Sequence, residues 1–557
     1  MLSRSFIVVS LLLTLLFPMI AAGQDKNCDT STGTQFNLEG VNGAPELGFA
    51  VPQMNPSVDF IPRGGVNGAD LVIGGAWDMR GRFNDYVVPV TVPPTPVPNA
   101  WGYGQSAYYV HRSGQGCSPD FEGALPSIPG TYQFLLGFHQ ASVAVDATRG
   151  MVYAADERAW PFQAGGIGLF KTTAANMDNP GICAQGTHNT DADGADAAAA
   201  RCWPIRTLLD PTPADNAELA EEEPELRADE RPSGVGAGDL YITYLFCCAT
   251  NSQGISNTEL RMVACPYTFS SVADCSKPMK ISGDEFSPSF PEVNVRPDGV
   301  VTLTYTSFTF NGFSQDLNYV SCVPHGAPNP PTCTTRSIVA TEERTFSETT
   351  QTVAHKFTVW TKPSHAERFN PATGKYEVFV AWANCGENTE VPVGQFAFLA
   401  ECPDANVVMA YSPTDDAGNA LSWSSVIPVN THIHDQVIPT VRSDRETNLV
   451  HIVYYSSEND PAGELLQLME SRVEPGTYAA ERPIALAKTL FDPMADFFLQ
   501  GGGPDGFGDL IIGTQIGIAA RSGRTYVHSV ATSIPGNFGN PGTLNSGYNN
   551  LLTRTSH

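Results

Sequence analysis

Residues 410–455 hold the most complete copy of a unit that recurs along this chain, and they read AYSPTDDAGNALSWSSVIPVNTHIHDQVIPTVRSDRETNLVHIVYY. An apolar segment is followed by a turn of Asp and Gly, a Trp, a short second segment, a proline-led third segment and a fourth that is rich in Val and Tyr. Short runs of this composition, bounded by Gly, Pro, Asp and Asn, predict β-strands.

The same order of segments recurs from one end of the chain to the other. Its most regular strand is DLVIGGAWD (70–78), MVYAAD (151–156), DLYITYL (239–245), VVTLTYTSF (300–308), YEVFVAWA (376–383), LVHIVYYSS (449–457) and TYVHSVAT (525–532). A four-strand unit repeated at roughly 75 residues predicts an all-β fold, a single β-propeller of four-stranded antiparallel blades.

The number of blades follows from the length. The 557 residues, less a leader, divide into about seven units. Six units are complete in order, and strands from the two chain termini would complete the seventh, which closes the ring and removes free sheet edges. Seven blades are therefore favoured, with six as the alternative. An open array of β-sandwiches would not require so uniform a unit.

The N-terminus predicts export. Arg4 precedes an apolar run over 6–20, and small residues follow at 21–23, so 1–23 is expected to be a signal peptide and 24–557 the propeller. We expect a secreted protein, extracellular or periplasmic, without an integral membrane span. The chain holds 31 Lys plus Arg against 58 Asp plus Glu, a balance that excludes a nucleic-acid partner. Residues 184–235 are expected to form an acidic insertion.

Twelve cysteines, all after the leader, predict disulfides, because an even number in an exported chain is typical of a disulfide framework. The spacing favours local pairs: Cys183 with Cys202, Cys265 with Cys275, Cys322 with Cys333, and Cys385 with Cys402. Cys28 with Cys117 and a vicinal Cys247–Cys248 bridge would use the others. A metal site is the rival interpretation, but the sequence contains no CxxC pair.

The quoted unit contains four residues that look like the Asp box of secreted sialidase-like β-propellers: Ser412, Asp416, Gly418 and Trp423. The pattern of that box is S-x-D-x-G-x-T-W. Here two extra residues precede the Asp and two more precede the Trp. The resemblance implies that this box is a folding element away from the active site. It also implies that Asp78 stands where that family has its acid/base Asp. The family's arginine motif corresponds to DFIPRGG, with Phe60 at the arginine position and Arg63 three residues later.

Propellers bind ligands at the mouth of the central channel. Candidates there are Asp78 as an acid/base residue and five ligand-binding residues: Arg63, Arg80, His139, His434 and Asp435. Two carboxylates held apart on rigid strands could act as acid and base on a glycosidic bond. The alternative is that carboxylates near strand ends accept hydrogen bonds from turn amides. His432 and His434, two apart, could form a metal-binding pair or lie in an exposed loop.

A segment at 189–196, NTDADGAD, is similar to the first half of an EF-hand loop, with Asn189, Asp191 and Asp193 at alternating positions before Gly194. The Glu expected six residues after the Gly is Ala200. No cofactor is required, and Ca²⁺ is the one this segment could hold. The stretch 217–230, AELAEEEPELRADE, is interpreted as an exposed loop.

These features leave three hypotheses, because the sequence does not name a reaction. The favoured one is a secreted propeller that binds an extracellular glycan or surface ligand without a recognisable complete catalytic set. The second is a glycoside hydrolase (exo-sialidase-like) or polysaccharide lyase acting at the channel mouth. The third is a structural surface or matrix protein. The oligomeric state does not follow from the sequence.

Overall fold

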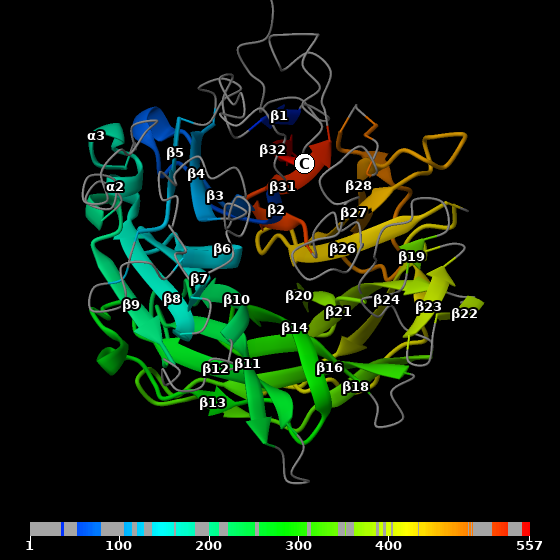
Figure 1. Cartoon of the computed structure of the whole chain (residues 1–557), viewed down its shortest axis with the longest axis horizontal. Helices are drawn as coiled ribbons and strands as arrows, with labels where there is room; N and C mark the ends of the chain where they lie inside the picture. Colours follow the sequence, from blue (N-terminus) through cyan, green and yellow to red (C-terminus); the bar gives the residue numbers. More distant parts are fainter. Residues whose placement is uncertain are drawn as a thin grey trace, which may run out of the picture.

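The computed structural model of the chain is a closed ring of seven β-sheets around a central channel (Figure 1). Each sheet is one blade: its first strand lies at the channel, and the other strands lie progressively further out. The predicted propeller of four-stranded antiparallel blades is confirmed, with seven blades. The structure describes residues 35–37, 53–78, 105–113, 120–126, 128, 136–160, 163–183, 200–210, 221–250, 256–308, 314–343, 351–352, 361–385, 389–393, 397–402, 405–432, 434–487, 490–491, 493, 515–532 and 548–556.

The strands of the first three blades, from the channel outward, are β2 (Gln53–Ile61), β3 (Leu71–Asp78), β4 (Gln105–Arg112) and β5 (Phe121–Ala124) in blade 1; β6 (Leu136–Asp146), β7 (Met151–Trp160), β8 (Gln163–Thr173) and β9 (Ile205–Leu209) in blade 2; and β10 (Glu221–Ala228), β11 (Leu240–Thr250), β12 (Ser256–Cys265) and β13 (Met279–Lys280) in blade 3.

The remaining blades are β14 (Phe286–Val295), β15 (Val301–Phe308), β16 (Ser314–Val323) and β17 (Thr332–Cys333) in blade 4, with β18 (Ser337–Glu343) also on β16; β20 (Ser364–Asn370), β21 (Lys375–Cys385), β24 (Ala405–Pro413) and β25 (Ile427–Pro428) in blade 5; β26 (Gln436–Ser443), β27 (Val450–Ser456), β28 (Gln467–Val473) and β29 (Ile484–Ala485) in blade 6; and β30 (Gly517–Arg521), β31 (Arg524–Thr532), β32 (Tyr548–Ser556) and β1 (Gln35–Asn37) in blade 7.

A few elements lie outside the blades. A small sheet combines β19 (Gln351–Thr352), β22 (Thr389–Val393) and β23 (Ala397–Cys402). The short helices are η1 (Val66–Gly68), α2 (Ala174–Met177), α3 (Pro180–Cys183) and η2 (Val272–Asp274). No helix in the described part of the chain is long and apolar enough to cross a bilayer.

The middle strands are buried on both faces, because each blade packs between two neighbours. β15 is buried at seven of its eight positions, which explains why VVTLTYTSF carries no charge instead of alternating apolar with charged residues. Tyr241 and Met262 of blade 3 share one apolar cluster with Val293 and Leu303 of blade 4. The hydrophobic core therefore consists of layers between blades.

The hairpins that follow the first strands repeat a buried aspartate that holds the turn. The side chains of Asp146 and Asp229 accept hydrogen bonds from the amides of Arg149 and Arg231, at 3.1 and 3.0 Å. The arginines then reach the next blade: Arg149 donates to the carbonyl oxygen of Arg231 (2.9 Å), and Arg231 donates to that of Asp298 (2.6 Å). Blades 2, 3 and 4 are thus linked in series at this end of the channel.

The two termini close the ring, as predicted. β1 pairs antiparallel with β32, so that Gln35 lies opposite Thr553, and the two strands lie beside blade 1 in Figure 1. At the seam between blades 7 and 1, the Arg521 and Asp59 side chains are 2.8 Å apart. An N-terminal strand therefore supplies the outermost strand of the last blade.

Three predicted disulfides are confirmed: Cys183–Cys202, Cys265–Cys275 and Cys322–Cys333. They agree with folding in an oxidising compartment. Cys385 is disulfide-bonded too, but Cys402 as its partner stays a prediction, since that side chain lies outside the described part. The same holds for the bridges proposed at Cys28, Cys117, Cys247 and Cys248, and the leader at 1–23 lies outside the described residues.

The expectation of an exposed acidic loop over 217–230 is wrong in part. Residues 221–228 form β10, the strand of blade 3 that lines the channel, and Glu225 and Leu226 are buried. The acidic residue is tolerated there because Lys362, from blade 5, lies against it. The expected insertion at 184–235 therefore contains two blade strands, β9 and β10.

Candidate functional site

The seven innermost strands place equivalent residues at one level of the channel. We call this set the channel ring: Ser57, Ser142, Glu225, Glu292, Ser364, Thr440 and Gly517. The end of the channel where the inner strands begin is the upper mouth, and the opposite end is the lower mouth. All seven residues line a cavity with about 410 Å³ of empty space, part of it open to solvent. Six of the seven side chains are polar and buried.

A repeated backbone irregularity aims the ring side chains. In five of the inner strands the pairing register shifts just before the ring residue, and such bulges bend a strand and re-aim its side chains. Three residues two positions before the ring have positive φ: Glu223 (54°), Phe290 (55°) and Ile438 (54°). A proline follows each of them. Proline fits there because an innermost strand is a sheet edge.

Ring hydroxyls join neighbouring blades. Ser57 Oγ donates to the carbonyl oxygen of Ala141 at 2.5 Å, and Ser364 Oγ accepts from the amide of Val441 at 2.8 Å. Thr440 Oγ1 accepts a longer amide hydrogen bond, of 3.4 Å, from blade 7. A hydroxyl that accepts such a bond still has its own hydrogen to donate. The ring can therefore hold the blades together and also face a ligand.

Lys362 crosses the upper mouth above the ring. Its Nζ donates to Gln515 Oε1 of blade 7 at 2.7 Å and lies 3.8 Å from the Glu225 carboxylate of blade 3. Glu225 also accepts from the hydroxyl of Ser142 at 3.2 Å. One lysine from blade 5 thus connects two blades on the far sides of the channel.

A second layer of charged residues lies two positions further along the strands. It includes Asp59, Arg227 and Arg442, and a second cavity, with about 600 Å³ of empty space, extends from it toward the lower mouth. Arg442 pairs with Glu292 of the ring. Burial raises the pKa of Glu292, but the charge of Arg442 outweighs it, so the pKa lies below its usual value.

Arg227 lies in the same layer but, unlike Arg442, has no carboxylate paired with it among the described residues. No hydrogen bond, and no ion pair within 4.0 Å, joins its guanidinium to the described residues. Burial and the positive charge of Arg442 lower the pKa of Arg227 to about 10, although three carboxylates act in the opposite direction. The charge of Arg227 is therefore incompletely compensated.

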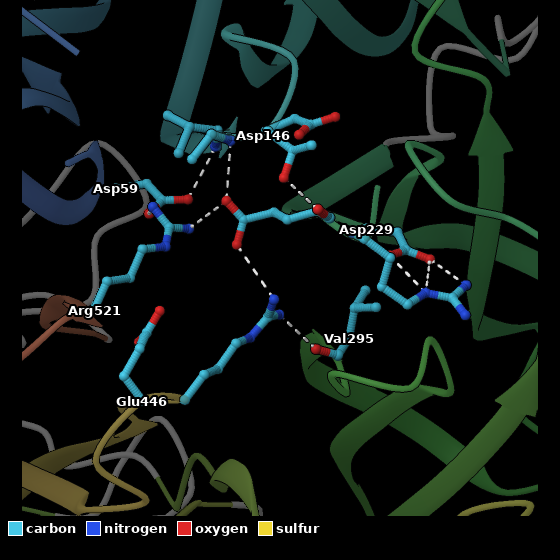
Figure 2. Close-up of polar contacts among 12 residues, drawn as sticks. Asp59, Asp146, Asp229, Val295, Glu446 and Arg521 are labelled. Carbon is cyan, nitrogen blue, oxygen red and sulfur yellow. Dashed lines mark hydrogen bonds and ion pairs between the residues drawn. The ribbon is translucent and has the colours of Figure 1, made fainter. Parts of the chain in front are cut away.

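A charge cluster, the lower cluster, lines the second cavity toward the lower mouth and is made of Asp59, Glu230, Arg445 and Arg521. Figure 2 shows Arg521 directed toward Asp59. Glu230 lies 3.2 Å from Arg521 and 3.4 Å from Arg445, and Arg445 donates to the Val295 carbonyl oxygen at 2.9 Å (Figure 2). Burial lowers the pKa of Arg521, but Asp59 and Glu230 outweigh this and raise it. Each charge of the lower cluster is therefore paired within the cluster.

Four predicted site residues lie at the upper-mouth end of their strands. Asp78 ends β3 and pairs with Gln53 at the start of β2, and His139 is near the start of β6; neither side chain is among the described ones. Half-buried His434 packs beside Gly463. Asp435 is buried and accepts the amide of Ala405, the first residue of β24 in blade 5, at 3.1 Å, and its role in ligand binding stays a prediction.

Arg63 lies at the other end of the same blade. It follows Ile61, the last residue of β2, is exposed, and has a φ of 54°. β3 runs seven residues from Leu71, the partner of Ile61, to Asp78, a rise of about 23 Å. One small ligand therefore cannot contact both Arg63 and Asp78.

The Asp-box residues lie at the end of β24 and in the connection from β24 to β25. Ser412 Oγ accepts the amide of Ser422 at 3.1 Å, Gly418 has a φ of 87°, and Trp423 Nε1 donates to Ser337 Oγ at 2.8 Å. The carboxylate that holds the turn is that of Asp415, which accepts the amide of Asn419 at 2.8 Å. Asp416 is exposed.

The other predicted site residues, Arg80, Asn189, Asp191 and Asp193, lie outside the described part of the chain, so the calcium prediction stays a prediction. Within the described ranges, no group of three or more His, Cys, Asp or Glu side chains is arranged to hold a metal ion.

Sequence reasoning missed the channel ring, Lys362, Arg227 and Arg442. One signal could have found the ring: a proline precedes a Ser, Thr or Glu and then an apolar residue in PSV, PEL, PEV and PTV, at 56–58, 224–226, 291–293 and 439–441. This motif precedes the inner hairpins of blades 1, 3, 4 and 6.

No family model matches the chain, and no curated protein matches it. Similar solved structures include an α-L-arabinofuranosidase from Fusarium graminearum with an iminosugar inhibitor, at 10% identity over 58% of this chain and 92% of that one, TM-score 0.30. An α-L-arabinanase from Penicillium chrysogenum with arabinobiose has 11% identity over 60% and 93%, TM-score 0.31. An endo-arabinase from Bacteroides thetaiotaomicron has 10% identity over 63% and 95%, TM-score 0.28. Such values carry no conclusion about activity.

Proposed function

We propose that this is an exported propeller that binds a glycan at the upper mouth of its channel, with the channel ring as the floor of the site. The observation that supports it is the ring itself, with four hydroxyls and two carboxylates at one level. A ligand covered with hydroxyl groups needs several donors and acceptors at once.

Two groups at the upper mouth are suited to contact such a ligand. The 3.8 Å separation of Lys362 and Glu225 is long for a charged hydrogen bond. Sugar hydroxyls can therefore bridge the two charges with little loss of the direct interaction between them. Thr440 keeps a hydroxyl hydrogen after accepting its amide bond. These residues come from three blades, so they are held at fixed separations by the fold.

A glycan panel tests the proposal. The folded protein and its Glu225→Gln variant are applied to immobilised neutral and acidic glycans, and retention is measured. We expect at least one glycan to be retained, and its affinity to fall about tenfold in the variant, because a hydrogen bond to a charged acceptor contributes about 1.5–3 kcal/mol.

Glu481→Gln is the matched control, since it makes the same change at an exposed position beyond β28. Its retention should equal that of the natural protein. Retention that is equal in all three proteins, or none on any glycan from a demonstrably folded sample, would count against binding at the channel ring.

Turnover is measured on the same panel, because the end of β3 brings Asp78 to the upper-mouth end of its blade. Released sugar is followed by mass spectrometry for the natural protein and for Asp78→Asn. Release that disappears in the variant would replace the binding function with a glycoside hydrolase of the sialidase-like kind. Retention without release supports a binding module.

A further inference from the structure

The charged side chains that line the channel do not all form ion pairs with one another. Its two cavities are lined by five carboxylates and six basic side chains; the carboxylates are Asp59, Glu225, Glu230, Glu292 and Glu367, and the basic groups are Arg227, Arg296, Lys362, Arg442, Arg445 and Arg521. The whole chain carries a formal charge of −27. Because Arg296 pairs with Asp298, which lines neither cavity, the other five basic groups equal the five carboxylates in number.

Every lining carboxylate already has a partner. Asp59 pairs with Arg521, Glu225 with Lys362, Glu230 with Arg445 and Glu292 with Arg442. Glu367 accepts a hydrogen bond from Thr302 and lies 3.5 Å from His365, whose pKa burial lowers. Arg296 pairs with Asp298 outside the channel. Arg227 is therefore the basic side chain of the lining that forms no ion pair with a carboxylate of the described residues.

Arg227 is also the residue that a diffusing ligand can reach. It lines both cavities, and it is only partly buried, so its exposed surface faces the channel. A guanidinium offers planar pairs of N–H donors that match a carboxylate or a sulfate in a bidentate way. No described residue supplies such an acceptor within hydrogen-bond distance.

We propose that Arg227 forms an oxyanion-binding site inside the channel, one layer below the channel ring, which takes a sulfate or a carboxylate. Arg442 adds a second positive charge beside it, but its pair with Glu292 leaves Arg227 as the group that binds. The oxyanion can arrive as a free ion or as the acidic group of a sugar, because both present the same chemistry to a guanidinium. The site does not depend on glycan binding at the ring.

The test is isothermal titration calorimetry of the full chain with three probes, namely sodium sulfate, sodium D-glucuronate and neutral D-glucose, at constant ionic strength. The variants are Arg227→Gln and, as the matched control, Arg482→Gln, which removes an exposed arginine between β28 and β29. We expect one oxyanion per chain in the natural protein and in the control. Affinity should fall at least about tenfold in Arg227→Gln.

The probes separate the two sources of the oxyanion. Sulfate and glucuronate that bind equally, with no binding of glucose, indicate a site for free ions. Glucuronate that binds more tightly than sulfate indicates that the natural ligand is an acidic sugar. If Glu225→Gln abolishes glucuronate binding but leaves sulfate binding unchanged, the sugar bound at Arg227 also contacts the channel ring. Glucose binding that survives in Arg227→Gln concerns the ring alone.

Thermal unfolding shows whether the Arg227→Gln variant is folded. Because the charge of Arg227 is poorly compensated, Arg227→Gln should unfold at the same temperature as the natural protein or higher, and sulfate should raise the unfolding temperature of the natural protein by more than that of the variant. No oxyanion binding to the natural protein, or equal binding to natural protein and Arg227→Gln, would overturn the proposal.

Discussion

Asp239 is a buried carboxylate whose charged form the fold disfavours. It lies at the end of the hairpin between β10 and β11, is 6% exposed, and accepts a hydrogen bond from the amide of Ala327 at 2.8 Å. Burial raises its pKa to about 6, the Ala327 amide acts in the opposite direction, and the nearby charge of Asp229 raises it again. The folded protein therefore binds a proton here that the unfolded chain releases at lower pH.

The Asp239→Asn variant should gain stability relative to the natural protein as the pH rises. Between the ordinary pKa of 3.8 and about 6, the folded state binds more protons than the unfolded one, so the contribution of Asp239 is most favourable below this window and is lost as pH rises through it. Urea unfolding at about pH 4 and about pH 7.5 should show a relative gain of about 1–3 kcal/mol for the variant. Asp416→Asn, at an exposed position, is the control. An equal difference at both pH values would contradict the raised pKa.

Individual residues of the site were hard to predict from the sequence, because the role of each residue depends on its position along the channel axis. Nothing in PELRADERPSG (224–234) or PEVNVRPDG (291–299) alone distinguishes Glu225 or Glu292 from a surface acid. Both become ring residues only when seven strands are aligned at their hairpins. Asp415 and Asp416 show the same limit at a turn: only hydrogen bonding identifies which one accepts the turn amide.

The hairpins on the outer side of blades 3 and 4 are elements with their own covalent support. Cys265 ends β12, and Cys275 lies in the loop that leads to β13. The bridge closes a loop of sequence separation 10. Since β13 has only two residues, Met279–Lys280, its own strand pairing is short, and the disulfide stabilises the outer edge of the blade.

The Cys265→Ser/Cys275→Ser double variant should therefore lose about 3 kcal/mol of stability, the value expected when a loop of this length is no longer closed in the unfolded chain. The free energy of unfolding in urea, measured under non-reducing conditions, checks this. A double variant at Cys322 and Cys333, with a separation of 11, should lose a similar amount. A loss in neither would mean that the outer strands hold these hairpins without covalent help.

Elements were more predictable than residues, because strand composition and turn chemistry are local. The strands around MVYAAD, DLYITYL and LVHIVYYSS are present as β7, β11 and β27, and the local cysteine spacing predicted three bridges. Local composition predicted the wrong structure where pairing with a residue distant in the sequence determines it. The acidic run at 217–230 resembles a solvated loop, but Glu225 is paired with a lysine that lies more than a hundred positions away in the sequence.

The molecule as a whole depends on a seam that no covalent bond crosses among the described residues. Blade 7 meets blade 1 where Gly517 of β30 approaches β2 so closely that a Cβ would lie 2.8 Å from the Ser57 backbone. Phe60 and Tyr526 pack edge to face across it, with ring centroids 4.8 Å apart. The length and the repeat predicted that termini would close the ring, but these contacts involve residues far apart in the sequence, which no local pattern can pair.

Asp70 is the polar centre of this seam, and its loss should loosen the whole ring. Its carboxylate, 1% exposed, accepts hydrogen bonds from the Tyr526 hydroxyl (2.9 Å) and the Arg63 amide (3.0 Å), and it pairs with Arg524 of blade 7. Asp70→Ala leaves a buried hydroxyl and a partly buried guanidinium without this acceptor, so the free energy of unfolding should fall by about 3 kcal/mol. Urea unfolding followed by circular dichroism and by tryptophan fluorescence measures it, with Asp416→Ala expected to change stability by less than about 0.5 kcal/mol. If the seam closes the ring cooperatively, both signals shift together to lower urea, whereas an unchanged midpoint would mean that the pairing of β1 with β32 holds the ring closed without Asp70.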